Sequence, residues 1–189
     1  MIRKLILLAM IAALAGVAKA YHDTMRDPVV KRLTVISDSM AQGAPPTTVA
    51  LVADIHVAGP DMPPSRVERI VAQVNALQPD LVAIAGDLIS EKMFATKTYS
   101  AQQTIAPLAG FSAPLGTVVV PGNHDHWFDW DSLRSELSKL ENVTVLENQA
   151  AQFGPFAMGV IGDAYIDRAD IPATMAEMAD LQGARVVLT

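Results

Sequence analysis

The chain of 189 residues contains no cysteine. Disulfide bonds and metal sites built on thiolates are therefore excluded, because both require cysteine sulfur. Because the chain has no cysteine thiols that could be oxidised, its composition is compatible with export to an oxidising compartment. Any metal ligands must come from other side chains.

Basic residues are outnumbered by acidic ones. The chain has 14 Lys and Arg against 20 Asp and Glu, a net charge of −6. The first 20 residues hold three of the basic residues and no acidic ones, so the remainder has 11 basic against 20 acidic residues, a net charge of −9. This balance argues against nucleic-acid binding through a basic surface and suits a protein whose carboxylates hold cations.

Internal repeats and low-complexity tracts are also missing. The length suits a single domain, and 51% of the residues are hydrophobic while 18% are charged. Such a chain can bury a substantial core, so we expect a globular domain rather than a disordered or fibrous protein.

The N-terminus has the pattern of an export signal. Arg3 and Lys4 precede an uncharged apolar run over residues 5–17, and Ala18-Lys19-Ala20 then forms an A-x-A site. Lys19 ends the run before the roughly 20 apolar residues that a spanning helix needs. We predict that residues 1–20 are a signal peptide or, as the alternative, a membrane anchor, and that the protein is exported (periplasmic or extracellular) or membrane-anchored.

Residues 21–47 read as a tether that leads into the domain. They are polar and mixed, with one candidate edge strand over residues 29–36 and a break at Gly43, Ala44, Pro45 and Pro46.

From residue 48 to residue 189 the pattern predicts an α/β domain. Short apolar runs at 48–53, 81–85 and 117–120 alternate with helical periodicity, which is typical of a buried, largely parallel sheet. Helices are expected over 65–77, with a Ser65–Glu68 capping box, over 99–108 and from Asp131 onward. Runs at 143–146, 150–153 and 156–161 indicate antiparallel pairing. A helix over 172–181 should pack through Met175, Met178 and Leu181, before a last strand over 184–189.

Polar residues follow each of the first three strands. In open α/β sheets ligands bind beyond the carboxyl ends of the strands. Each cluster alone is explained equally well by turns and loop openings. Together they offer oxygen and imidazole donors at one sheet edge, which suit Mn, Fe or Zn. The clusters are Asp54-Ile55-His56, Gly86-Asp87 and Gly122-Asn123-His124-Asp125-His126.

These clusters match the D-x-H, G-D and G-N-H-[DE] blocks of a known family. From about residue 48 to 189 the sequence resembles the calcineurin-like metallophosphoesterases. The resemblance implies a four-layer α/β/β/α sandwich with two divalent metal ions. It also implies hydrolysis of a phosphomonoester or phosphodiester, so a phosphoester is the expected partner.

The resemblance also implies residue roles. Asp54 and His56 would bind the first metal, Asp87 would bridge both metals, and Asn123 would bind the second. His124 is implied to be catalytic rather than a ligand: it would stabilise the phosphoryl charge or protonate the leaving oxygen, and with Asn123 it would contact substrate. Asp125 would orient the His124 ring.

Five nearby residues have weaker claims. An ordinary loop histidine is the favoured interpretation of His126, with a substrate contact as the alternative. Asp163 and Asp61 are read as loop residues, although either could line the site. Trp127 and Trp130 are expected to pack in the core beneath the site loop rather than face substrate.

Two further family blocks, a single His after a strand and G-H-x-H, are not found in the sequence. We therefore expect a sandwich incomplete at its C-terminus, in an inactive or weakly active fragment of a longer reading frame, with uncovered apolar faces. The alternative from another class is a non-catalytic scaffold that binds proteins. A Rossmann-like nucleotide site is disfavoured, because the Gly-rich turn after the first strand is missing. A lipid or envelope-derived substrate is only mildly favoured by the N-terminus.

Overall fold

The computed structural model describes residues 2–40, 43, 45–91, 93 and 95–189. Ala44, one residue of the break predicted at 43–46, lies outside the described residues. The chain divides into two compact units, residues 1–32 and 33–189.

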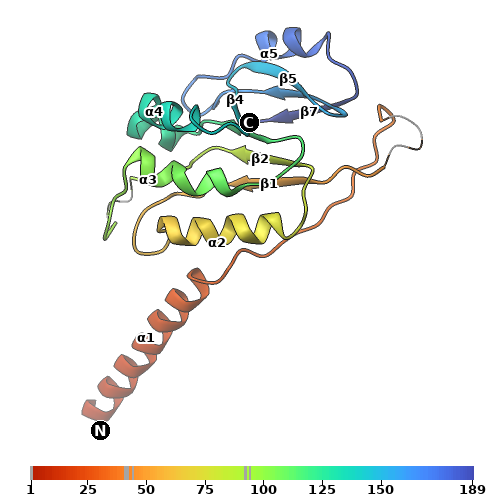
Figure 1. The fold of residues 1–189 in the computed structure, drawn as a ribbon. Coiled ribbons are helices and arrows are strands. Elements are labelled where there is room, and N and C mark those ends of the chain that lie inside the picture. Colours follow the sequence, from red (N-terminus) through yellow and green to blue (C-terminus); the bar gives the residue numbers. More distant parts are fainter. Residues whose placement is uncertain (1, 41–42, 44, 92, 94) are drawn as a thin grey trace. The chain divides into compact units, whose positions relative to one another are not determined.

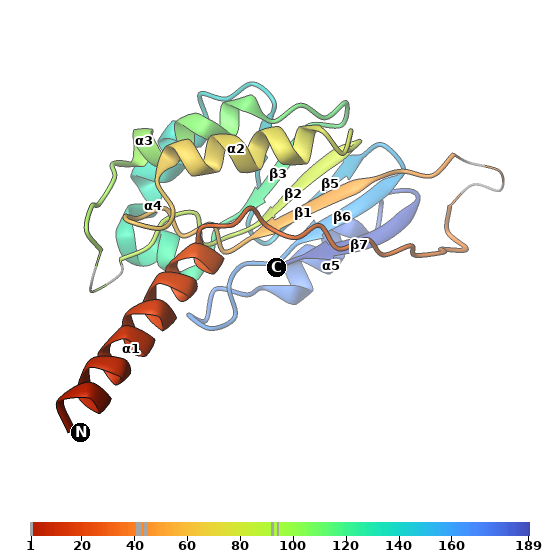
Figure 2. The ribbon, with the colours of Figure 1, turned by 90° about the horizontal axis from the view of Figure 1, so that it is seen from below.

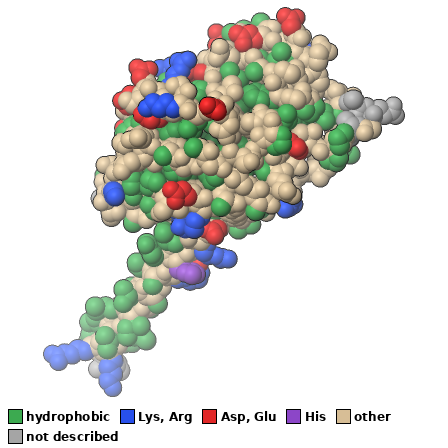
Figure 3. Space-filling model, viewed as in Figure 1, with side chains coloured by type: hydrophobic (Ala, Val, Ile, Leu, Met, Phe, Trp, Pro, Cys, Tyr) green, Lys and Arg blue, Asp and Glu red, His purple; other side chains and the backbone are tan. Residues whose placement is uncertain are grey.

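The first unit contains one long helix, α1 (Ile2–Thr24), which is long and apolar enough to cross a membrane by length and composition. Hydrophobic side chains cover most of it in Figure 3, and basic side chains gather at its N-terminal end. The helix continues past Ala20, where the predicted A-x-A site ends, and Lys19 pairs with Asp23 at 2.6 Å. Lys19 therefore lies within the helix, although it ends the uncharged apolar run. The predicted edge strand over 29–36 is wrong, since the structure has no strand there.

The second unit is built on a parallel sheet in the order β1-β2-β3-β4. Its strands are β1 (Val49–Ala53), β2 (Leu81–Ala85), β3 (Thr117–Val120) and β4 (Val143–Val145). The largely parallel sheet is thereby confirmed. The antiparallel pairing predicted for residues 143–146 is wrong, because β4 pairs parallel with β3. The helix between β3 and β4 returns the chain to the start of the sheet, as a parallel crossover requires.

Helices cover one face of this sheet: α2 (Pro64–Asn75), α3 (Ala101–Ile105) with the 3-10 turn η1 (Ala106–Gly110), and α4 (Asn123–Leu137). Figure 2 shows α2 and α3 on the same side of the strands. Alternate side chains of β2, such as Val82 and Ile84, pack with the helices in one core.

Three helix starts differ from expectation. No Ser65–Glu68 capping box forms, because α2 begins at Pro64 and Ser65 already lies inside the helix, after the N-cap residue Pro63. Ser100 and Gln103 instead cap α3. Helix α4 consists of two helical segments joined at Asp129 (φ −178°, ψ 83°). The predicted start near Asp131 matches the second segment, and the first segment, which begins at Asn123, was not expected.

A second sheet lies behind the first in the order β5-β6-β7. The strands are β5 (Gln149–Phe153), β6 (Phe156–Val160) and β7 (Ala184–Leu188). The antiparallel pairing of β5 with β6 confirms that prediction, and β7 joins β6 in parallel. The faces of β2 and β3 turned away from the helices pack against Phe153, Met158 and Val160 in a separate core.

Helix α5 (Ile171–Met178) forms the fourth layer, outside the second sheet (Figure 1). The Cε of Met178 lies against Gly159, and Met178 is 1% exposed. The predicted packing face is therefore right for Met178 and wrong for Met175, which is 36% exposed. The helix ends at Met178, so only about two helical turns are available for the predicted apolar periodicity. The four layers match the predicted α/β/β/α sandwich.

One apolar strand face stays open to solvent. Leu51 of the edge strand β1 is 67% exposed. Its register partner Ala83 belongs to the core between the sheets, so Leu51 lies on the same face beyond the cover of the second sheet.

Candidate metal centre

The three predicted clusters lie at one edge of the parallel sheet. Ala53, Ala85 and Val120 are register partners and end or nearly end their strands. The residues that follow them therefore leave the sheet side by side, as expected for carboxyl ends of parallel strands.

The backbone of these loops is held in an uncommon conformation. Asp54, His56 and Asp87 have φ values of 53°, 51° and 53°, in the left-handed region that non-glycine residues seldom occupy. The two loops are tied by hydrogen bonds, because the His56 N–H donates to the Asp87 carbonyl at 2.8 Å and the Val57 N–H to that of Leu88 at 2.9 Å. Such strained residues cluster where side chains must be aimed at a ligand.

Glycine permits a close approach between the second and third loops. A Cβ on Gly86 would lie 2.5 Å from the Gly122 nitrogen, and Gly86 has φ 65°. A Cβ on Gly122 would lie 2.6 Å from the Asp87 nitrogen and would overlap its carboxylate. The His124 N–H can therefore reach Asp87 Oδ1, to which it donates at 3.0 Å.

The side chains of the first two loops converge on His56. Its Nε2 lies 3.5 Å from Asp87 Oδ2 and 3.7 Å from Asp54 Oδ1. Ligand atoms of His56, Asp87 and His124 all lie within 4.8 Å of one another, so these three side chains could hold a metal ion. His124, expected not to be a ligand, thus stands among the candidate donors.

The histidine rings contact each other edge to face. The His56 and His124 centroids are 4.9 Å apart, with an interplanar angle of 87°. Nδ1 of each ring is buried without a hydrogen-bond partner in the described residues. Asn123 is the first residue of α4, immediately before His124.

The Asp125 carboxylate makes its hydrogen bonds to backbone N–H groups, and Nδ1 of the His124 ring has no hydrogen-bond partner in the described residues. Oδ1 accepts from Leu88 N at 2.8 Å and Ile89 N at 3.3 Å, and Oδ2 accepts from Gly122 N at 2.9 Å. Asp125 therefore joins the second and third loops. Burial raises the pKa of its carboxyl to about 6, against the opposing effect of these hydrogen bonds.

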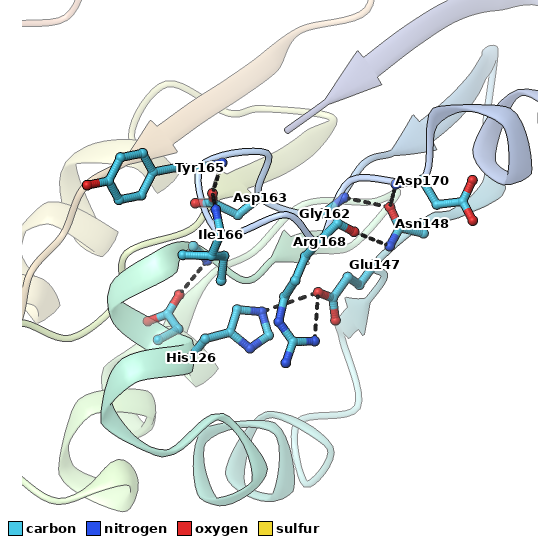
Figure 4. Close-up of polar contacts among 11 residues, drawn as sticks. His126, Glu147, Asn148, Gly162, Asp163, Tyr165, Ile166, Arg168 and Asp170 are labelled. Carbon is cyan, nitrogen blue, oxygen red and sulfur yellow. Dashed lines mark hydrogen bonds and ion pairs between the residues drawn. The ribbon is translucent and has the colours of Figure 1, made fainter.

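His126 belongs to a second polar cluster, shown in Figure 4. Its Nε2 lies 3.2 Å from Glu147 Oε1, which is 3.7 Å from the Arg168 guanidinium. Burial and then the Arg168 charge lower the pKa of His126. This placement supports a structural His126. Glu147 and Arg168 were missed, since the sequence marks Glu147 only as a turn residue.

The remaining candidates divide between loop and surface. The Asp163 carboxylate accepts from the Tyr165 N–H at 2.6 Å, which fits a loop residue. Asp61 is half-buried, and its carbonyl accepts from the Arg66 guanidinium at 2.7 Å. Trp130 packs against the core as expected, whereas Trp127 is 49% exposed, so its predicted burial is wrong.

The donors present fit a divalent cation. The carboxylate of Asp87 and the imidazoles of His56 and His124 have ligand atoms within 4.8 Å of one another, and Asp54 Oδ1 lies 3.7 Å from His56 Nε2. Oxygen and nitrogen donors of this kind suit borderline divalent ions.

A family model described as calcineurin-like phosphoesterase matches residues 47–170. The chain belongs to this family. Calcineurin-like phosphoesterases use divalent metals, which agrees with the candidate group at the sheet edge. A solved structure aligns with TM-score 0.51 and 13% identity over 75% of this chain and 68% of its own, and supports the fold.

Several family relatives are similar in sequence. The Caenorhabditis elegans protein F40B5.2, classed with the metallophosphoesterases, is 31% identical over 76% of this chain and 28% of its own. An uncharacterised metallophosphoesterase of Campylobacter jejuni is 27% identical over 78% and 37%. A Bos taurus transmembrane protein with a metallophosphoesterase domain is 32% identical over 53% and 21%. The chain therefore spans about a third of the length of the curated relatives it matches.

Proposed function

We propose that this protein hydrolyses a phosphomonoester or phosphodiester with two divalent metal ions. The observation that carries the proposal is the convergence of Asp54 and Asp87 on His56 Nε2, at 3.7 and 3.5 Å. Asp54 and His56 would hold one ion, Asp87 would be shared, and Asn123 would serve the second. When bound, such ions polarise phosphoryl oxygens and supply a nucleophilic water at neutral pH.

The protein's own side chains would position the metal ligands and protonate the leaving oxygen. The Asp87 carboxylate is fixed on one oxygen by the His124 N–H at 3.0 Å, which leaves its other oxygen facing His56. His124 would contact the substrate and protonate the leaving oxygen, because an imidazole can donate a proton near neutral pH. Asp125 would keep His124 in place through the backbone of the two loops rather than through the ring.

Metal uptake and hydrolysis test this proposal separately. The chelated chain should bind Mn by calorimetry. Hydrolysis of bis(p-nitrophenyl) phosphate or p-nitrophenyl phosphate should be weak and should require added Mn, because the single-His and G-H-x-H blocks are not found in the sequence. Asp87→Asn should weaken Mn binding at least tenfold, whereas Asp180→Asn, an exposed acid on another surface, should not.

His124→Ala should abolish hydrolysis. Mn uptake that persists in this variant would support a catalytic His124, whereas weakened uptake would indicate that His124 is a ligand. Equal Mn uptake by the Asp87→Asn variant would refute the metal centre. Mn uptake without hydrolysis of either ester would favour a non-catalytic scaffold.

We also propose that helix α1 addresses the protein to a membrane or across it. The helix has a mean hydropathy of 1.8 over its most apolar window, and basic residues stand at its start. Sequencing the N-terminus of the protein recovered from cell fractions decides between the two fates. A mature chain that begins at Tyr21 indicates a cleaved signal, and an intact chain in the membrane fraction indicates an anchor. An intact chain in the soluble fraction would refute both.

A further inference from the structure

We infer that Trp127 and Tyr165 form an aromatic rim that binds a flat aromatic group on the substrate, an inference that rests on the proposed phosphoesterase function. The rim is part of a row of four rings that starts at the metal centre. Centroid distances along it are 4.9 Å from His56 to His124, 5.0 Å from His124 to Trp127 and 6.1 Å from Trp127 to Tyr165. An organic group attached to a phosphoryl centre beside His124 would meet Trp127 first.

The two outer rings are available for contact. Trp127 is 49% exposed and Tyr165 is 80% exposed, while Trp130 on the same helix packs against the core. Large aromatic side chains are usually kept largely buried, so two adjacent exposed ones are informative when they stand beside a candidate site.

The backbone that carries Tyr165 is held in place by hydrogen bonds. The Asp163 carboxylate accepts from the N–H groups of Tyr165 at 2.6 Å and Ile166 at 3.3 Å. The Asn148 side chain accepts from Gly162 N at 2.9 Å and donates to the Arg168 carbonyl at 2.7 Å. The loop is therefore positioned at both ends.

The same loop is linked to the helix that carries Trp127. Arg168 lies 3.7 Å from Glu147, and Glu147 lies 3.2 Å from His126, the residue before Trp127 (Figure 4). The Tyr165 ring points away from this polar cluster in the figure. Side chains from helix α4 and from the loop between β6 and α5 are thus brought together, and their rings meet at 70°.

This geometry favours a flat group. Aromatic rings attract one another in offset or edge-to-face arrangements, and Trp and Tyr give rigid contact area at small entropic cost. An aryl ester or a nucleobase offers the same planar surface, so both belong to the substrate class that the rim would select.

Affinity for non-hydrolysable ligands tests the rim without requiring turnover. The Mn-loaded chain is titrated with phenylphosphonate and with methylphosphonate, and binding is followed by calorimetry. We expect about tenfold tighter binding of phenylphosphonate. Trp127→Ala and Tyr165→Ala should each reduce this ratio to about two without changing Mn affinity, and Tyr21→Ala, which removes an exposed aromatic on α1, should leave the ratio unchanged. Trp127→Phe should keep most of the preference.

The outcomes distinguish failure of the aromatic rim from failure of the proposed phosphoesterase function. A chain that takes up no Mn would overturn the proposed function and the rim with it. A Mn-loaded chain that binds neither phosphonate would overturn both proposals. A chain that binds both phosphonates equally, or keeps its preference in both alanine variants, would overturn the rim alone. Titration with a nucleoside monophosphate and with phenyl phosphate in the His124→Ala variant then shows which planar group binds more tightly.

Discussion

Replacing Gly122 with alanine should disrupt the metal centre through sterics alone. Gly122 has φ −96° and ψ −179°, a backbone conformation that alanine adopts freely. Its added Cβ would nevertheless lie 2.6 Å from the Asp87 nitrogen, where ordinary contacts begin at 3.4 Å, so the two loops must separate by about 0.8 Å.

Asp87 cannot move that far without losing contacts. Its carbonyl accepts from His56 N at 2.8 Å and its Oδ1 accepts from His124 N at 3.0 Å. Forced backbone shifts cost about 1–3 kcal/mol and a lost hydrogen bond about 1 kcal/mol more. We therefore expect Gly122→Ala to lower the free energy of unfolding by about 2–4 kcal/mol and to weaken Mn binding.

Urea unfolding and Mn calorimetry measure the two effects. Gly110→Ala is the matched control, because its Cβ would meet only a Val71 methyl, at 3.1 Å, and a side chain can shift. The control should change the free energy of unfolding by less than about 1 kcal/mol, within the range of ordinary substitutions. If Gly122→Ala is as stable as the control and binds Mn normally, the close approach of the loops does not determine the site.

Three further changes test other contacts. Asp125→Asn should lower the free energy of unfolding in urea by about 1–3 kcal/mol. The amide NH2 of asparagine would face a buried backbone N–H whose hydrogen bond the carboxylate now accepts. An unchanged urea midpoint would contradict that role. Asn148→Ala should lower the free energy of unfolding by about 1–2 kcal/mol. It should also reduce the preference for phenylphosphonate, because the loop 161–170 loses its anchor. An unaltered preference in calorimetry would contradict this prediction. The Ser132 hydrogen bonds lower the pKa of Asp129, so they contribute stability above the unfolded pKa that is lost as the pH falls through the folded pKa. Ser132→Ala should raise that pKa in an NMR titration and reduce the loss in acid.

Much of the metal centre follows from local pattern. The apolar runs before Asp54, Asp87 and Asn123 predict neighbouring parallel strands, and parallel strands place their carboxyl ends at one edge. Convergence of these residues therefore needs no knowledge of distant packing. The strand boundaries were found closely for the same reason, since a buried strand is a continuous run of apolar residues.

Other features of the fold and the site do not follow from local sequence pattern. Periodicity describes one element and not its partner, so the parallel pairing of β4 and the exposure of Trp127 were both misjudged. The early start of α4 was missed because Asn123 and its neighbours are polar and resemble a loop. The binding of Asp125 to backbone N–H groups of Leu88 and Ile89 depends on how two loops meet.

The sequence by itself indicated the family, the parallel sheet and the edge at which the candidate ligands gather, because each motif follows its strand directly in the chain and strands joined through a helix pair in parallel. Tertiary structure alone brought Tyr165 to Trp127 and Glu147 to His126. Those contacts join segments from two different sheets and their connections. They arise from the burial of apolar faces between the layers, and no short-range pattern specifies which polar or aromatic side chains that burial will place together.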